Sequence, residues 1–168
     1  MTNVFRLLAV GSALVLAGCG PKEPPVPVVP EKTEAELRII QYFGEDIMAD
    51  KAITWRPSGL GIKVITPGEG PTPQMMDRVR VHYTGRLKDG TVFDDSHNNG
   101  HPSDFPVNRL ITGWSASMSS LKPGGKGVFY IPPHLAYGGI RAGKIPPFSG
   151  LVFEVELIAV NPPEPPRG

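Results

Sequence analysis

Beyond Trp55 the sequence pattern changes to short β-rich runs separated by turn residues. In the clearest of them, Arg78 to Leu87, Val79, Val81 and Tyr83 alternate with polar residues. Such alternation is typical of a strand in a sheet that buries one face. The other runs cover residues 62–66, 127–131 and 151–160. These runs predict a sheet whose strands are joined by tight turns.

One stretch within this region breaks the alternation. Between residues 110 and 121 the large apolar side chains recur at helical spacing, at Leu110, Ile111, Trp114, Met118 and Leu121. One short helix packed against one antiparallel sheet makes an α+β domain. We expect this domain to cover residues 58–160.

The N-terminus has the pattern of an export signal. Arg6 precedes an apolar stretch, Leu7 to Leu16, that is shorter than the about 20 residues needed to span a bilayer. The segment Leu16-Ala17-Gly18-Cys19 then resembles the bacterial lipobox. This resemblance implies that residues 1–18 are a lipoprotein signal peptide and that Cys19 is lipidated. The alternative is an ordinary signal peptide cut nearby, with Cys19 incidental.

A lipidated Cys19 would anchor the chain in the cell envelope, because several acyl chains on one residue hold a protein stably at a membrane. Gly20 follows the cysteine, so the aspartate type of retention signal is missing. We therefore expect delivery to the outer membrane, facing the periplasm, in a cell that has one.

Proline-rich segments lie at both ends of the expected domain. Residues 19–32 contain five prolines, a composition that favours an extended polyproline II chain. The thirteen residues after Cys19 reach roughly 40 Å at about 3.1 Å each, so they could hold the domain off the membrane or simply be disordered. Residues 161–168 contain four prolines and are expected to be a disordered tail.

Residues 33–57 are predicted to hold a short amphipathic helix and a connector. Thr33 and Glu36 have the spacing of a capping box, which predicts a helix from about Glu34 to Ala49. Its apolar residues recur three and four apart, at Leu37, Ile40, Phe43 and Ile47. A helix this short is expected to pack on its own domain; pairing with a second copy is the alternative.

Several classes of function are disfavoured by composition and motifs. The 17 basic and 16 acidic residues are scattered, with no basic run to follow a phosphate backbone, so no nucleic-acid partner is expected. No phosphate-binding loop, Gly-x-Ser-x-Gly or His-Glu-x-x-His motif is present, and we expect neither cofactor nor metal. His97 and His101 are separated by a loop sequence, and His82 is expected to make a structural hydrogen bond on its strand.

Aromatic residues are unusually frequent in the expected domain. Taken singly, each is best explained by core packing, but several lie beside turns or at the start of a helix. They are Tyr83, Phe93, Phe105, Trp114, Phe129, Tyr130, Tyr137, Phe148 and Phe153.

These aromatics belong to motifs that resemble the FKBP family of prolyl isomerases. The matches run in order, with family-like spacing, over residues 58–160. They are Val81-His82-Tyr83-Thr84-Gly85, Phe93-Asp94-x-Ser96, Phe105-x-Val107, Leu110-Ile111-x-Gly113-Trp114, Leu135-Ala136-Tyr137-Gly138, Ile145-Pro146-Pro147 and Phe153-x-Val155-Glu156-Leu157. The resemblance implies a twisted antiparallel sheet wrapped on one short α-helix.

The resemblance also implies an apolar pocket with Trp114 as its floor. Asp94 and Tyr137 would supply polar groups at the rim, and the Ile111 N–H would anchor a substrate carbonyl. The implied catalytic residues are Tyr83, Phe93, Asp94, Ile111, Trp114, Tyr137 and Phe153. The implied substrate-binding residues are Phe105, Leu110 and Ile145.

The implied activity is peptidyl-prolyl cis/trans isomerisation (EC 5.2.1.8) in exported proteins, without covalent or acid–base chemistry. Proline-containing polypeptides would be the substrates, and macrolides of the rapamycin type would be inhibitors. An envelope chaperone that binds proline segments with little turnover is the alternative. A purely structural envelope lipoprotein would leave the aromatic residues unexplained.

Overall fold

The computed structural model of the chain describes residues 31–163. The predicted signal peptide, Cys19, the proline-rich linker up to residue 30 and the tail from residue 164 lie outside the described residues. In the part described, no helix is long and apolar enough to cross a membrane.

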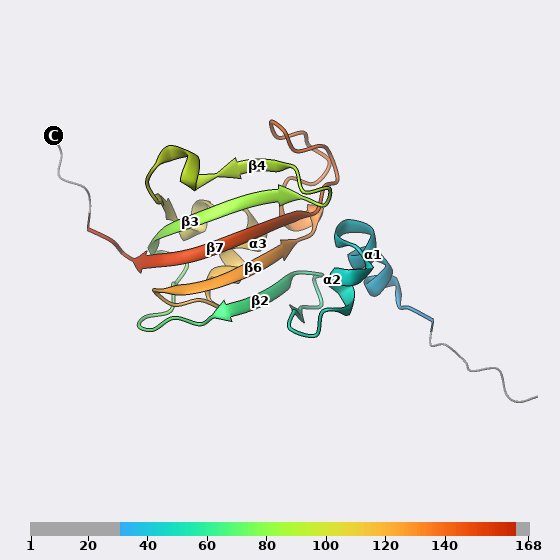
Figure 1. Cartoon of the computed structure of the whole chain (residues 1–168), viewed down its shortest axis with the longest axis horizontal. Coiled ribbons are helices and arrows are strands. Elements are labelled where there is room, and N and C mark those ends of the chain that lie inside the picture. The colour runs from blue at the N-terminus through green and yellow to red at the C-terminus, as the bar shows by residue number, and fades with distance from the viewer. Residues whose placement is uncertain (1–30, 164–168) are drawn as a thin grey trace, which may run out of the picture. The chain divides into compact units, whose positions relative to one another are not determined.

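A seven-stranded antiparallel sheet is the framework of the described chain (Figure 1). Its main path has the order β1-β2-β6-β7-β3-β4, and β5 also pairs with β3. The strands are β1 (Thr54–Trp55), β2 (Gly61–Thr66), β3 (Arg78–Leu87), β4 (Val92–Asp95), β5 (Ser103–Pro106), β6 (Gly125–Ile131) and β7 (Leu151–Val160).

The four runs predicted as strands are all strands, and β3 and β7 have the predicted bounds. Along β3 the side chains of Val79, Val81 and Tyr83 are buried, which confirms the alternating pattern. The strands β4 and β5 pair with successive parts of the same edge of β3, as Thr84 opposite Asp95 and Val79 opposite Phe105 show. This shared edge places aromatic residues of β4 and β5 along one side of β3.

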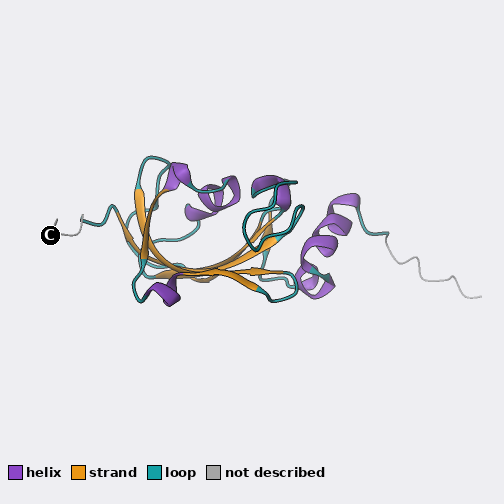
Figure 2. Ribbon diagram, turned by 90° about the horizontal axis from the view of Figure 1, so that it is seen from above, coloured by secondary structure: helices purple, strands orange, loops and turns teal. Residues whose placement is uncertain are grey.

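The helix α3 (Thr112–Met118) lies on the concave side of the curved sheet (Figure 2). It is shorter than the predicted stretch, because Leu110 and Ile111 precede its first turn and Leu121 follows its C-cap, Ser119. Gly113 allows the close approach of α3 to β6, since a Cβ there would lie 2.3 Å from Cγ2 of Ile131. Three short 3₁₀ turns lie between the strands: η1 (Ser96–Asn99), η2 (Val107–Arg109) and η3 (Pro133–Leu135).

Two helices, α1 (Glu34–Phe43) and α2 (Glu45–Ala49), replace the single helix predicted here. That prediction is wrong because Gly44, with a φ of 105°, turns the chain between them. The capping box is confirmed: the Thr33 N–H donates to Glu36 Oε2 at 2.7 Å, and the Glu36 N–H donates to Thr33 Oγ1 at 3.3 Å.

The apolar face of α1 also differs in part from the prediction. Phe43 is buried, but Ile39 is buried beside it and Leu37 is 54% exposed. The buried residues pack against Tyr130 of β6 and Trp55 of β1. Residues 32–163 belong to one compact unit, in which α1 packs on the sheet as expected.

Asn161, which the sequence assigned to the tail, closes the end of the sheet. Its backbone N–H donates to the Arg78 carbonyl at 2.7 Å, and its Oδ1 accepts from the Arg78 N–H at 2.9 Å. Its side-chain amide also donates to Asp77 Oδ1. The folded sheet therefore includes the first residue beyond β7.

Candidate active site

Trp114 is the centre of the aromatic cluster between α3 and the sheet. It is 3% exposed, and its ring makes edge-to-face contacts with Tyr83 and Phe153 at centroid distances of 5.5 and 5.3 Å. Phe129 lies edge-on to it at 6.2 Å. Aromatic pairs in this geometry pack favourably, so the indole is held firmly.

Gly85 of β3 leaves space for two aromatic rings that form a wall of the cleft beside Trp114. A Cβ on Gly85 would lie 2.6 Å from the ring of Phe93 and 2.9 Å from that of Phe153. Without a side chain at this position, the two rings meet edge-to-face at 5.4 Å above the strand. Only glycine is compatible with this arrangement of the wall.

A cleft of about 490 Å³ opens above Trp114. All ten catalytic and substrate-binding residues implied by the resemblance line it. They come from four strands, from α3 and the connection before it, and from the segment between β6 and β7: Tyr83, Phe93, Asp94, Phe105, Leu110, Ile111, Trp114, Tyr137, Ile145 and Phe153. The structure thus brings the whole set together, while the role of each residue stays a prediction.

Four further residues line the cleft that sequence reasoning did not assign to it: Arg109, Ala142, Gly143 and Lys144. Each is next to an assigned residue or lies in the same loop, so sequence neighbourhood was the only available signal. The loop is closed by hydrogen bonds between the backbones of Ala142 and Ile145, at 3.1 and 2.9 Å. Ile145 is thereby turned inward and is 5% exposed.

The main polar contact of the cleft joins Tyr83 to Asp94. The Tyr83 hydroxyl donates to Asp94 Oδ2 at 2.7 Å. Burial, and then this hydrogen bond, raise the pKa of Tyr83 above its ordinary value. The phenol therefore remains protonated, and Asp94 acts as its acceptor.

Two other polar groups face the opening. Tyr137 is 40% exposed at the rim. Ile111 is the N-cap residue of α3, and its backbone N–H donates a hydrogen bond to no group within residues 31–163. Both groups are available to bind carbonyl oxygens of an inserted peptide.

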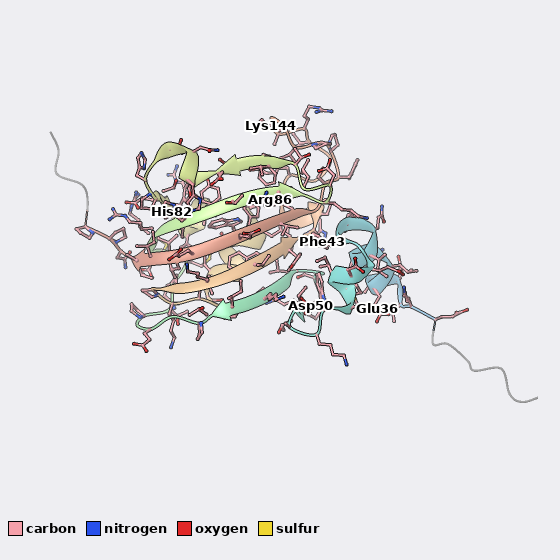
Figure 3. The ribbon with its side chains drawn as sticks, viewed as in Figure 1. Glu36, Phe43, Asp50, His82, Arg86 and Lys144 are labelled. Atoms are coloured by element: carbon pink, nitrogen blue, oxygen red, sulfur yellow. The ribbon has the colours of Figure 1, made fainter. Side chains whose placement is uncertain are left out.

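The histidines lie outside the cleft lining. His82 (Figure 3) lies with its Nδ1 3.0 Å from Ser96 Oγ, which confirms its predicted structural hydrogen bond. Its ring stacks on that of His97 with 4.4 Å between the centroids. His97 Nδ1 contacts Asp95, and His101 Nδ1 contacts the Pro102 carbonyl. Within residues 31–163, no group of three or more His, Cys, Asp or Glu side chains has the arrangement of a metal site.

Among the described residues, the cleft lining contains no serine, cysteine or histidine. What it offers is a desolvated aromatic surface with a few fixed hydrogen-bonding groups. Such a site can bind a compact apolar group and hold the carbonyls on either side of it.

An antiparallel sheet wrapped on one helix, with an aromatic cleft between them, defines an FKBP-type domain. The family model for FKBP-type peptidyl-prolyl cis-trans isomerases matches residues 70–158. The chain belongs to this family.

Similar proteins include bacterial isomerases. The FKBP-type 22 kDa peptidyl-prolyl cis-trans isomerase of Escherichia coli is 48% identical over 122 residues, which are 72% of this chain and 59% of that protein. FkpA of Aeromonas hydrophila is 43% identical over 127 residues, or 73% of this chain and 47% of that protein. The chain thus spans only about half the length of these relatives.

Solved structures show the same fold. The crystal structure of FkpA from Escherichia coli matches with a TM-score of 0.68 at 41% identity, over 70% of this chain and 55% of that one. A peptidyl-prolyl cis-trans isomerase from Pseudomonas syringae matches with a TM-score of 0.65 at 39% identity, over 76% of this chain and 92% of that one. The predicted α+β fold is confirmed.

Proposed function

We propose that the chain catalyses cis/trans isomerisation of peptide bonds that precede proline, acting on segments of exported proteins. The observation that carries this proposal is the apolar cleft, whose floor is Trp114 and whose walls are aromatic rings from separate strands. The family to which the chain belongs supports the same activity.

The chemistry requires no covalent step. Rotation about an X-Pro bond faces a barrier of roughly 18 to 20 kcal/mol, because the amide loses resonance when it is twisted. The twisted amide has less charge separation than the planar one. Transfer to a dry aromatic cleft therefore disfavours the planar ground state relative to the transition state. A millionfold acceleration needs about 8 kcal/mol of such differential stabilisation.

Fixed polar groups orient the peptide during this rotation. The unpaired Ile111 N–H and the Tyr137 hydroxyl are placed to donate to carbonyls that flank the prolyl ring. Asp94 is oriented by Tyr83 and serves as an acceptor rather than as a proton shuttle. Large apolar side chains before the proline would fill the aromatic wall and should be preferred to charged ones.

The same cleft is the proposed site for macrolides of the rapamycin type. Its volume of about 490 Å³ falls in the range of roughly 300 to 1,000 Å³ that is usual for sites of small molecules. A bound macrolide would exclude the peptide and so inhibit the isomerase.

The proposed location is the cell envelope, with Cys19 lipidated and the domain held in the periplasm at the outer membrane of a Gram-negative cell. Support comes from the lipobox-like Leu16-Ala17-Gly18-Cys19 and from Gly20 after it. Residues 20–32 would act as the spacer between the membrane and the folded domain.

The deciding experiment measures the isomerisation rates of a panel of X-Pro peptides with the purified full chain, by protease-free NMR exchange. We expect acceleration that is greatest for Leu and Phe before proline and that a rapamycin-type macrolide blocks. A folded chain that binds these peptides in the cleft without accelerating any of them would replace the enzyme with the alternative, a binding module with chaperone function.

A further inference from the structure

Two cationic side chains stand at the opening of the aromatic cleft. Arg109 is the last residue of η2, and Lys144 lies in the loop that ends at Ile145, where it extends outward beyond β4 (Figure 3). Both are solvent-exposed and both line the cleft. They come from segments that are far apart in the sequence.

Most other basic side chains of the described chain have a partner. Lys63 is paired with Asp50 at 2.7 Å, and Arg80 holds Asp104 through two hydrogen bonds of 2.7 and 2.8 Å. The remaining cations of this group are paired with carboxylates or bound to backbone carbonyls: Lys32, Arg38, Arg86, Lys126, Arg56 and Lys88. Eight of the fourteen basic side chains within residues 31–163 are thus paired.

Neither Arg109 nor Lys144 takes part in an ion pair or side-chain hydrogen bond within residues 31–163, and the same holds for the neighbouring Arg141. The one acidic residue of the described lining, Asp94, already accepts from Tyr83. Nearby Asp95 bonds His97. The cleft lining therefore carries two positive charges that form no ion pair within residues 31–163, against the single negative charge of Asp94.

We infer that the cleft selects prolyl segments that carry an acidic side chain close to the X-Pro pair. This inference rests on the proposed isomerase function and specifies its substrate class. The aromatic wall receives the prolyl ring and the apolar residue before it. A carboxylate on an adjacent residue then lies at the rim, where Arg109 and Lys144 supply attraction that the folded chain does not use itself.

The test compares peptides that differ only in one flanking residue. Capped Ala-Glu-Leu-Pro-Phe-Ala and Ala-Leu-Pro-Phe-Glu-Ala are each measured against the peptide with Gln in place of Glu, using the full chain and NMR exchange. For at least one pair we expect kcat/KM to be about three- to fivefold higher with Glu at low salt, as for one or two exposed ion pairs. The preference should disappear at about 0.5 M salt, where such charges are screened.

Charge-removing variants locate the effect. In R109Q/K144Q the preference for Glu over Gln should fall to about one, because the rim then has no cation within the lining. K122Q is the matched control, since Lys122 is exposed, is likewise free of ion pairs among the described residues, and lies outside the cleft lining. It should keep the preference of the unaltered chain.

Three results would be decisive against the inference. Equal rates for Glu and Gln peptides of both pairs at low salt would overturn it while leaving the isomerase in place. A preference that persists in R109Q/K144Q, or one that K122Q removes equally, would assign it to the general charge of the chain. Absence of acceleration for every peptide, Gln peptides included, would refute the isomerase function itself.

Discussion

The Tyr83 hydroxyl donates a 2.7 Å hydrogen bond to Oδ2 of Asp94, and so links the wall of the cleft to its rim. The two residues reach each other because β3 and β4 are paired, with Gly85 opposite Asp94. The buried Ser96 hydroxyl adds a second link, since it accepts from the Tyr83 N–H at 2.8 Å. The position of the Asp94 carboxylate is thus fixed by neighbouring strands before a substrate binds.

Replacing Asp94 with Ala should reduce kcat/KM about tenfold while the fold is retained, because the carboxylate is exposed and orients the substrate rather than packing in the core. Tyr83→Phe should cause a smaller loss, since the ring still packs on Trp114 but the carboxylate is no longer held. Circular dichroism checks the fold and peptide exchange the rate. Full activity of Asp94→Ala would contradict the role proposed for this residue.

The rate of isomerisation should stay nearly constant between about pH 5 and pH 9, because no proton is transferred in the proposed mechanism. Tyr83 keeps its proton over this range, as burial and Asp94 raise its pKa. A bell-shaped profile of kcat/KM on folded protein would instead indicate acid–base catalysis.

Stability should depend on pH through the same tyrosine. Above about pH 10 the unfolded chain loses the Tyr83 proton while the folded chain retains it, so the free energy of unfolding decreases as pH rises. Tyr83→Phe should weaken this alkaline loss in urea titrations at a series of pH values. An unchanged alkaline slope in the variant would assign the loss to other groups.

Trp114→Ala should damage both stability and activity, because the indole is the floor of the cleft and part of the core. We expect a loss of about 3 to 5 kcal/mol in unfolding free energy. Leu121→Ala is the matched control: Leu121 is fully buried but does not line the cleft. The Leu121→Ala variant should lose about 2 to 5 kcal/mol of unfolding free energy. Its folded fraction should keep the kcat/KM of the unaltered chain. Equal activity of the two folded variants would contradict the role of Trp114.

A strand could be predicted from the sequence where its own residues show the alternating pattern. In β3 and β7, alternation over ten residues sets both bounds. In β4 and β5, four residues each are too few for a pattern, and their pairing with β3 decides their structure. The break at Gly44 was missed because a glycine is tolerated within many helices, and only the backbone φ shows that this one ends α1.

Within the site, the resemblance to the FKBP family implied the aromatic and polar residues, because each lies in a motif that the sequence matches. Gly85 belongs to one of these motifs, but only the three-dimensional structure shows why it is glycine: the rings of Phe93 and Phe153 occupy the space of its side chain. Nothing in the sequence indicated that Arg109 and Lys144 line the cleft, since lysine and arginine are scattered along the whole chain. Their significance arises from lacking partners beside a cleft.

Cys19→Ala tests the anchor proposed at the N-terminus. If the lipobox-like segment is processed as proposed, the unaltered chain should incorporate labelled palmitate in a bacterial host and stay with the membrane fraction. The variant should take up no label and should leave the membranes or remain as an uncleaved precursor. An unaltered chain that is exported and cleaved without label would favour the ordinary signal peptide.

A substitution at Phe43 tests whether α1 packs on the sheet of its own chain. Its ring is 6% exposed and contacts Tyr130 and Trp55 at centroid distances of 5.7 and 5.9 Å. Phe43→Ala should therefore lower the free energy of unfolding by about 3 kcal/mol, measured by urea denaturation. Leu37→Ala on the same helix is the control, and should change it by less than about 0.5 kcal/mol because Leu37 is 54% exposed.

The same pair of variants separates packing within one chain from pairing of two copies. If α1 packs only on its own sheet, light scattering should give a monomer for the unaltered chain and for both variants, with the stability loss confined to Phe43→Ala. A dimer that Phe43→Ala abolishes would show that the helix pairs with a second copy. A dimer that only Leu37→Ala abolishes would place the pairing on the exposed face of α1, since Leu37 is the large apolar side chain that this helix leaves to solvent.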